Sequence, residues 1–219
     1  MDPVVREYAS NARDYDRKWS FYVESTTRET ISRLEMAPTD RVLDVGCGTG
    51  ELLTRLAAKF PRARLAGIDP VPQMLKVAQD KLSDGVDLRV GWANELPWPD
   101  ASFDVVVSCN MFHYITHPED SVREMRRVLA PGGRLLITDW CDDYFTCRMC
   151  TAYLRLMSKA HFKTYKKEEC AALLREAADL ESKIERYKIS WLWGLMTAKV
   201  TKQAGSQALH STAAVVTRA

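Results

Sequence analysis

The sequence predicts an α/β protein in which helices cover a parallel sheet. From about residue 40 onward, short β-rich runs alternate with amphipathic helical stretches, which is the pattern of strand–helix units joined into one sheet. The chain has 219 residues, of which 46% are hydrophobic and 27% are charged, and these values are typical of a folded globular domain. We therefore expect one α/β domain and exclude a fibrous or wholly disordered protein.

The first elements of this alternation lie on either side of a glycine-rich turn. Residues 41–45 form a compact apolar run that ends in glycines, and residues 51–60 then repeat leucines and alanines on one helical face. A second strand is expected at 64–68, and a helix with Pro72 in its first turn follows it. This order predicts two successive strand–turn–helix units.

The remaining elements complete the sheet and its helical cover. Further strands are expected at 86–90, 103–108 and 134–138, and further helices at 119–129, 146–159 and 166–178. The run Pro131-Gly132-Gly133 separates the helix at 119–129 from the next strand. Two β-prone runs at 183–189 and 195–200 suit an antiparallel pair at the sheet edge, because only a few residues connect them.

The two ends of the chain differ from this central region. Residues 1–39 contain no strand signal but several aromatic side chains, and we expect them to form a helical cap on the domain. The central domain then spans residues 40–202, with a helical insert at about 141–165. Residues 203–219 are small and polar without sustained periodicity, which is typical of a loosely ordered tail.

The charge balance and the apolar runs exclude several function classes. Lys and Arg total 31 against 29 acidic residues, so the chain lacks the broad positive field of a general nucleic-acid binder. Its N-terminus has an early acid and no long apolar core, unlike a secretory signal, and its most apolar later run, 191–200, is far shorter than the ~20 residues of a membrane span. We expect a cytoplasmic protein with no integral membrane association. The basic excess over residues 148–202 is typical of a solvated face but also suits an anionic or membrane-surface substrate.

The six cysteines are expected to be free thiols, because no secretory signal accompanies them. Cys147 and Cys150 form a CxxC pair that is compatible with a soft-metal or arsenic site. The same two residues share a helical face with Leu154 and Met157, which favours an interpretation as small buried hydrophobic residues. Both interpretations of the pair stay open at this point.

The most informative segment lies between the first strand and its helix. Gly46, Gly48 and Gly50 follow the strand at alternate positions, so the backbone can turn tightly and approach a ligand near the unpaired N–H groups of a helix start. This arrangement predicts a nucleotide-like ligand. A dinucleotide fingerprint needs Gly or Ala at position 51, where Glu51 stands, and Asp44 precedes the first glycine by two residues. Nicotinamide binding is therefore disfavoured.

The loop resembles the first motif of the class I S-adenosylmethionine-dependent methyltransferases, which has the form D/E-x-G-x-G-x-G. The similarity extends through Gly67-Ile68-Asp69-Pro70, through 96–104 and through 128–139, and it is closest to the small quinone-methyltransferase-like (methyltransferase type 11) branch. The resemblance implies a Rossmann-like, doubly wound sheet with strand order 3-2-1-4-5-7-6, in which strand 7 is antiparallel. It implies S-adenosyl-L-methionine as the cofactor and a small-molecule methyl acceptor. A nucleotide-dependent oxidoreductase and a non-catalytic S-adenosylmethionine-binding protein are the alternatives.

The resemblance also implies which residues contact the cofactor. Asp69 corresponds to the acid that holds the ribose hydroxyls, although an Asp there also suits a helix cap. Asp44 is near enough to the loop to order its amides or to favour the cationic methionine end. Trp92 replaces the acid that receives the adenine amino group in many relatives. The expected cofactor set is Asp44, Gly46, Cys47, Gly48, Gly50, Asp69, Pro70, Val71, Trp92, Ala93, Asn94, Ser108, Asn110 and His113.

Methyl transfer requires a base only if the acceptor is a hydroxyl, a thiol or an acidic carbon. The candidates, in no order, are His113, Asp139, Asp142 and His161, although a single histidine without a visible partner favours a packing or hydrogen-bonding role for His113. No metal is expected, because Ser108, Cys109 and Asn110 occupy the positions after strand four where metal-dependent relatives place an acid.

The expected acceptor-side residues are aromatic side chains of the cap and the insert. Their apolar faces and polar tips suit a planar or lipophilic small molecule, and ordinary core packing is the alternative explanation. The set is Tyr15, Trp19, Tyr22, His161 and Tyr165.

Overall fold

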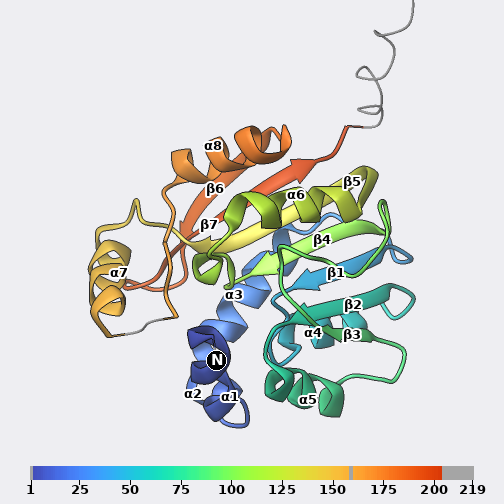
Figure 1. Ribbon diagram of the computed structural model, residues 1–219, viewed down its shortest axis with the longest axis horizontal. Helices are drawn as coiled ribbons and strands as arrows, with labels where there is room; N and C mark the ends of the chain where they lie inside the picture. Colours follow the sequence, from blue (N-terminus) through green and yellow to red (C-terminus); the bar gives the residue numbers. More distant parts are fainter. Residues whose placement is uncertain (1, 158–159, 204–219) are drawn as a thin grey trace, which may run out of the picture.

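A computed structural model describes residues 2–157 and 160–203, and within these residues seven strands form one sheet (Figure 1). The strands are β1 (Arg41–Val45), β2 (Arg64–Asp69), β3 (Asp87–Val90), β4 (Phe103–Cys109), β5 (Leu129–Trp140), β6 (Ser182–Lys188) and β7 (Gly194–Thr201). Their order is β3-β2-β1-β4-β5-β7-β6, and β7 pairs antiparallel with both β5 and β6. The predicted strand order and the antiparallel edge are confirmed.

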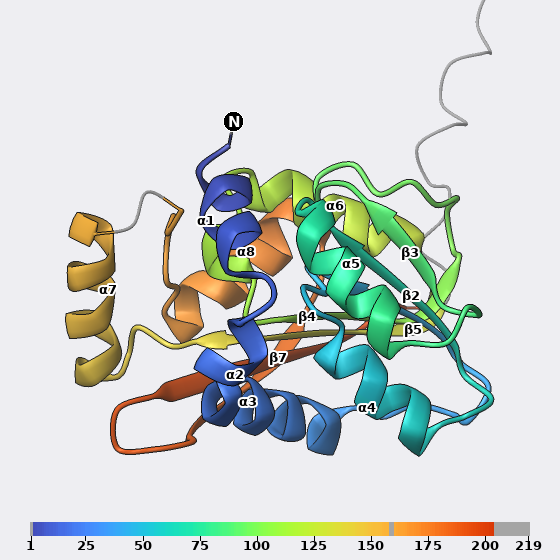
Figure 2. The same cartoon turned by 90° about the horizontal axis from the view of Figure 1, so that it is seen from below.

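Helices cover both faces of the sheet, and α7 projects at one end of it (Figure 2). Helices α3 (Ser20–Arg33) and α4 (Glu51–Lys59) lie on one face, and α6 (Pro118–Val128) and α8 (Lys167–Ala178) lie on the other. The other helical elements are α1 (Pro3–Asn11), α2 (Tyr15–Lys18), α5 (Pro72–Lys81), the 3₁₀ turn η1 (Phe112–Tyr114) and α7 (Phe145–Met157). Across residues 2–157 and 160–203, no helix combines the length and apolar character that crossing a membrane requires.

The apolar periodicity of the helices explains how they attach to the sheet. Leu52, Leu53 and Leu56 of α4 are buried against one face, and Val122 and Met125 of α6 are fully buried against the other. Burying a side chain of this kind contributes roughly 1.5 to 3 kcal/mol. Apolar helices therefore cover both faces of the sheet, and the carboxyl ends of its strands remain open to polar groups.

Strand β5 begins earlier than residue 134, the start that the sequence predicts. Leu129 already pairs with Phe103, and the register then shifts before the regular ladder from Val105 onward. The irregularity is possible because Gly132 has a left-handed backbone with φ of 75°. The main chain of Lys202 exchanges hydrogen bonds with Gly132 and Gly133, which extends the strand through the proline–glycine turn.

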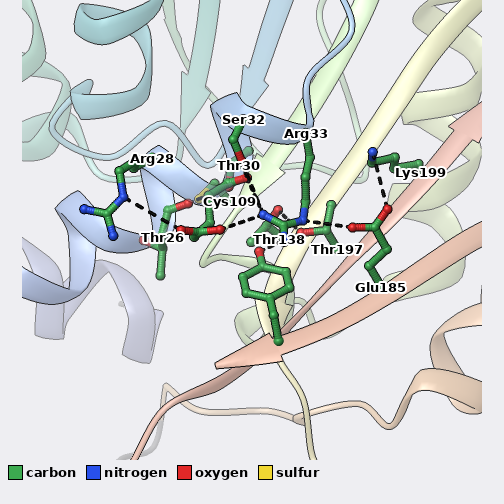
Figure 3. Close-up of polar contacts among 12 residues, drawn as sticks. Thr26, Arg28, Thr30, Ser32, Arg33, Cys109, Thr138, Glu185, Thr197 and Lys199 are labelled. Carbon is green, nitrogen blue, oxygen red and sulfur yellow. Dashed lines mark hydrogen bonds and ion pairs between the residues drawn. The ribbon is translucent and has the colours of Figure 1, made fainter. Parts of the chain in front are cut away.

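Helix α3 contacts the sheet through polar as well as apolar groups (Figure 3). Thr30 Oγ1 lies 3.3 Å from Cys109 Sγ, and Arg33 Nε donates to Glu185 Oε2 at 3.1 Å. The Arg33 guanidinium also stacks 3.7 Å from the ring centre of Tyr187. The hydroxyl of Thr30 donates back to the carbonyl of Thr26, so this face can be buried without an unsatisfied donor. These contacts fix the helix that carries Tyr22 into the site.

Candidate functional site

The glycine loop forms one wall of a cleft at the carboxyl ends of β1, β2 and β4. The main-chain N–H groups of Gly46 and Cys47 both donate to the Ile68 carbonyl, at 2.8 and 3.0 Å. Gly46 has φ of 76°, and a Cβ there would lie 2.2 Å from the side chain of Met111. Only glycine therefore permits both the turn and the close approach of the segment after β4. Open α/β sheets bind ligands at this edge.

Asp69 connects the glycine loop to the start of α5. Its Oδ2 accepts the N–H of Gly48 and its Oδ1 accepts the N–H of Val71, each at 2.9 Å. Burial raises the pKa of Asp69 to about 6. The residue at the N-cap of α5 is Val71 rather than Asp69. The carboxylate orders the loop, and each oxygen retains a second lone pair for a ligand hydroxyl.

Asp44 is a buried acid whose Oδ1 has no hydrogen-bond partner among the described residues. It lines the cleft. Burial, and then the charge of Asp69, raise the pKa of Asp44 to about 8. An unpaired carboxylate in such a place is costly unless a cation or a donor arrives. The site thus fits the methionine end of S-adenosylmethionine, which carries an ammonium and a sulfonium.

Most of the sequence-predicted cofactor residues line this cleft. These are Asp44, Gly46, Cys47, Gly48, Asp69, Pro70, Val71, Trp92, Ala93, Asn94 and Asn110. Three others do not line it in the described part of the chain. Gly50 packs against α5, where an added Cβ would lie 2.9 Å from that of Ala78. Ser108 is wholly buried within β4, and His113 lines a neighbouring cavity instead.

Residues of the N-terminal cap line the cofactor cleft, whereas the sequence predicts the aromatic side chains of the cap for the acceptor side. Tyr8 and Tyr15 line it from the cap side, and the Tyr8 hydroxyl donates to the Tyr114 hydroxyl at 2.5 Å. Thr49 Oγ1 donates to Asp16 Oδ1 at 2.6 Å, and Asp16 also pairs with Lys81 of α5. The aromatic content of the cap was the signal for its place at this edge of the sheet, but it does not separate cofactor contacts from acceptor contacts.

A second cavity adjoins the cleft and has mainly aromatic walls. It is lined by Glu7, Tyr8, Asn11, Tyr15, Lys18, Trp19, Tyr22, Asn110, His113, Tyr114, Trp140, Leu154 and His161. Tyr8, Tyr15, Asn110 and Tyr114 line both cavities. The two spaces therefore meet at these four side chains.

His113, which lines the second cavity, is paired with Asp139 behind it. His113 Nδ1 is 2.6 Å from Asp139 Oδ1, and both side chains are almost completely buried. The His113 ring stacks on Trp140 and lies 5.5 Å, between ring centres, from His161. With the carboxylate on Nδ1, the ring carries its proton there and leaves the Nε2 lone pair free to accept one.

Tyr22 and Asn110 form a polar group beside that pair. The Tyr22 hydroxyl donates to Asn110 Oδ1 at 2.8 Å and accepts a hydrogen bond from the Trp140 indole N–H. Burial raises the pKa of Tyr22 well above its ordinary value, so this phenol stays protonated. Trp140 is a site residue that the sequence did not single out, although its position directly after Asp139 was a usable signal.

Tyr165, predicted on the acceptor side, and Asp142, a candidate base, line neither cavity. Tyr165 is 5% exposed, and its ring packs 5.4 Å from that of Phe112 in the main core. Asp142 is tied to the same segment, because its N–H donates to the Tyr165 carbonyl at 2.9 Å. In the described chain neither residue lines a cavity. The isolated bridge between Cys141 and Tyr165 holds this strand inside the fold.

The CxxC pair is divided between the interior and the surface. Cys147 is buried, and its Sγ contacts the Gly194 carbonyl at 3.2 Å, whereas Cys150 is partly exposed. Among residues 2–157 and 160–203, no three His, Cys, Asp or Glu side chains group as a metal site requires. The packing interpretation of Cys147 agrees with this geometry.

Comparison with known proteins places this site in a family. The sequence model described as a methyltransferase domain matches residues 43–137. A demethylmenaquinone methyltransferase of Thermotoga maritima is 35% identical over 160 residues, which cover 69% of this chain and 69% of that protein. The chain belongs to the class I S-adenosylmethionine-dependent methyltransferase family. Family membership implies S-adenosylmethionine as the cofactor of the cleft.

Other members of the methyltransferase family match shorter stretches. The ubiquinone/menaquinone biosynthesis C-methyltransferase of Ectopseudomonas mendocina is 41% identical over 119 residues, 52% of this chain and 46% of that protein. A demethylmenaquinone methyltransferase of Deinococcus radiodurans is 36% identical over 144 residues, 63% of this chain and 60% of that protein. The chain thus matches roughly half of the length of these two relatives.

Solved methyltransferase structures share the fold. A methyltransferase of Thermotoga maritima superposes with a TM-score of 0.73 at 21% identity, over 90% of this chain and 98% of that chain. The phosphoethanolamine N-methyltransferase 2 of Haemonchus contortus, solved with S-adenosylhomocysteine, has a TM-score of 0.75 at 15% identity, over 92% of this chain and 60% of that chain. At these identities the likeness establishes the doubly wound architecture.

Proposed function

We propose that this protein transfers the methyl group of S-adenosylmethionine to a planar, lipophilic small molecule with a quinone-like ring. The observation that carries the proposal is the junction of the cofactor cleft with an aromatic cavity at Tyr8, Tyr15, Asn110 and Tyr114. A donor in one space and an acceptor in the other meet at that junction, as an in-line displacement requires. When bound, the cofactor supplies an electrophilic methyl group on a sulfonium, which is a good leaving group.

The residues of the cleft account for binding and orientation. Asp69 accepts the ribose hydroxyls in addition to its two backbone amides, and Asp44 faces the cationic methionine end. Val71 is buried and gives an apolar surface to the adenine ring, and Trp92 and Asn94 border that ring. In this proposal the loop amides and the two carboxylates position the donor, and the cap excludes water from it.

The residues of the second cavity account for the acceptor. Tyr15, Trp19 and Tyr22 enclose a planar ring together with Trp140, and His161 lies beside His113. His113 Nε2 accepts the proton that an acceptor hydroxyl or an acidic ring carbon loses as its bond to the methyl group forms. Asp139 is a positioning residue that keeps the His113 ring in the required tautomer and stabilises the imidazolium.

The relatives support a quinone-like acceptor over other small molecules. Two of them are named for demethylmenaquinone methylation and one for ubiquinone and menaquinone biosynthesis. The aromatic, largely uncharged wall of the second cavity agrees with such a ring, since a strongly polar amine substrate would need acidic partners there. Glu7 is the acid among the described lining residues of that cavity.

The decisive experiment measures transfer of a tritiated methyl group from S-adenosylmethionine to defined acceptors. A reduced demethylnaphthoquinone and a reduced benzoquinone represent the proposed class, and a primary amine such as histamine represents a polar alternative. We expect label in the quinols and much less in the amine. Label only in the amine would contradict the acceptor class. Binding of a nicotinamide dinucleotide in preference to S-adenosylmethionine would contradict methyl transfer itself and favour the oxidoreductase.

A further inference from the structure

Helix α7 carries apolar side chains on its inner and outer faces. The inner face is anchored, because Cys147 contacts Gly194 and the Thr151 hydroxyl donates to Thr164 Oγ1 at 3.0 Å. On the outer face, Phe145, Met149 and Tyr153 are 71%, 59% and 62% exposed. Their spacing of four residues aligns them as one stripe along the helix. Helix α7 projects from one end of the molecule in both views (Figures 1 and 2).

The tip of the β6–β7 hairpin lies beside the first turn of this helix. The N–H and carbonyl of Gly194 both contact Cys147 Sγ, so the hairpin and α7 are packed together. Trp191, at that tip, is 79% exposed. We call Phe145, Met149, Tyr153 and Trp191 together the α7 surface. Large apolar side chains gathered on a protruding part of a protein commonly mark an interaction site.

Two exposed basic side chains lie near the α7 surface and have no acidic partner among the described contacts. The neighbouring acids are paired elsewhere, Asp143 with Arg186 at 3.1 Å and Glu169 with Lys163 at 3.4 Å. Arg148 is exposed on the helix beside the apolar stripe. Lys188, also exposed, lies at the base of the hairpin with its Nζ 5.4 Å from the ring centre of Tyr144. A partner for this surface must therefore combine apolar material with negative charge.

We infer that the α7 surface docks on a lipid bilayer that contains anionic lipids. Exposed aromatic and apolar side chains with basic residues beside them are the combination that binds at a membrane interface. Trp and Tyr favour the headgroup level, and each nearby Lys or Arg adds attraction to anionic lipid. The four residues of the α7 surface line neither described cavity. Leu154, the residue after Tyr153, does line the second cavity.

This docking has a consequence that rests on the proposed function. Leu154 of α7 and Trp19 of the cap both line the aromatic cavity. A bilayer in contact with α7 would therefore lie close to the aromatic cavity. A lipophilic acceptor could then pass from the bilayer into that cavity without crossing water. The docking itself needs no methyl transfer, so the two proposals can fail separately.

Vesicle flotation tests the docking directly. Full-length protein is floated with phosphatidylcholine vesicles and with vesicles of phosphatidylcholine and phosphatidylglycerol. We expect it to rise with the anionic vesicles, to remain behind with the neutral ones and to lose binding as salt screens the charges. Protein that stays behind with both, or that rises equally with both, would overturn the inference.

Two sets of substitutions assign the binding to the α7 surface. The combined variant Phe145→Ser, Met149→Ser and Trp191→Ser should no longer float, whereas Val90→Ser, a 60% exposed residue of β3, should float like the wild type. The pair Arg148→Glu and Lys188→Glu should lower the partition coefficient by at least about thirtyfold, the effect of two unit charges at an anionic surface. The matched pair Lys59→Glu and Arg62→Glu, exposed at the far end of α4, should have little effect.

Two further measurements test whether unfolding of the variants or self-association of the protein explains the flotation results. Calorimetric binding of S-adenosylmethionine without vesicles shows that the variants are folded and reports the cofactor site independently of docking. Variants that bind cofactor and still float normally would overturn the assignment to this surface. Sedimentation velocity of the wild type tests for a second copy on the same surface. A dimer that the triple substitution dissociates would replace the bilayer as the occupant and overturn the inference.

Discussion

Asp139 holds His113 at two points: its Oδ1 lies 2.6 Å from the ring Nδ1, and its Oδ2 accepts the His113 main-chain N–H at 3.0 Å. The His113 carbonyl in turn accepts the N–H groups of Phe162 and Lys163. One carboxylate thus fixes both the backbone and the ring of the histidine. The ring can neither rotate nor change tautomer without breaking a buried, charged hydrogen bond.

His113→Ala and Asp139→Asn should both lower turnover while the cofactor still binds. Loss of a general base typically costs about 10² to 10⁴ in rate, and the Asp139→Asn amide would donate to Nδ1 and place the ring proton on Nε2 instead. Steady-state kinetics with a quinol acceptor measures turnover, and calorimetry measures S-adenosylmethionine affinity. Normal turnover in both variants would leave His113 with a packing role only.

Asp69→Ala should weaken S-adenosylmethionine binding by about 2 kcal/mol, on the scale of a hydrogen bond to a charged group. The variant loses the proposed ribose contacts and also frees the amides of Gly48 and Val71. Calorimetry gives the affinity, and urea denaturation reports any loss of folding stability. Asp80→Ala, an exposed acid of α5, is the matched control. Unchanged affinity in folded Asp69→Ala would remove the ribose assignment.

Asp44 should make the ligand-free protein less stable as the pH rises. The pKa of Asp44 is about 8 in the folded protein, above its ordinary 3.8, so between these values the folded state holds a proton that the unfolded state releases. Asp69, whose pKa is about 6, contributes in the same direction. The free energy of unfolding should therefore fall from about pH 4 to about pH 8.

Asp44→Asn should reduce this pH dependence and weaken cofactor binding. We expect the ligand-free variant to exceed the wild type in stability by about 2 kcal/mol at pH 8, the scale of a buried unsatisfied charge, and by much less near pH 5. Urea denaturation at the two pH values and calorimetry test both effects, with Asp80→Asn as the control. A variant that is less stable at pH 8 yet binds cofactor normally would contradict the assigned role.

Trp19→Ala and Tyr165→Ala should have different consequences, because one residue lines a cavity and the other belongs to the core. Trp19 is 40% exposed, so its truncation should leave stability nearly unchanged, keep cofactor affinity within about tenfold, or ~1.4 kcal/mol, and lower quinol turnover. Tyr165→Ala should lower the free energy of unfolding by roughly 3 to 5 kcal/mol, as for other buried aromatic residues. Thermal and urea unfolding measure the stability of the two variants, and steady-state kinetics measures their quinol turnover. Equal losses of stability would contradict the placement of Trp19.

Asp16→Asn should speed the release of S-adenosylhomocysteine. Asp16 ties the cap to Thr49 of the glycine loop and to Lys81 of α5, so a weaker tether should let the cap open more often. Stopped-flow release measures the rate, for which we expect an increase of about fivefold, or ~1 kcal/mol. Asp14→Asn removes an exposed pair with Arg17 and should have no effect. An equal rate in both variants would show that the cap does not control release.

Local patterns in the sequence predict the strands, the helices and the glycine turn, and the family resemblance adds the strand order and much of the cofactor cleft. The run 41–45, the alternate glycines and the helix after them are contiguous, and their periodicity and turn chemistry act over a few residues. Asp44 and Asp69 each follow from their place at a strand end. The same local reasoning could not show that Gly50 serves the packing of α4 on α5, or that Ser108 lies inside β4, since a Cβ contact and a strand face depend on partners distant in sequence.

The sequence by itself determined the order of strands and helices, the glycine turn and the two carboxylates at one sheet edge, because hydrophobic period and backbone stereochemistry are local properties. The tertiary structure alone decided which side chains from distant segments meet. It pairs His113 with Asp139, lines the cofactor cleft with Tyr8 and Tyr15 of the cap, and buries Tyr165 in the core. These outcomes depend on how η1, the cap and the segment after α7 pack on the same sheet edge, and long-range packing has no periodic signature in the chain.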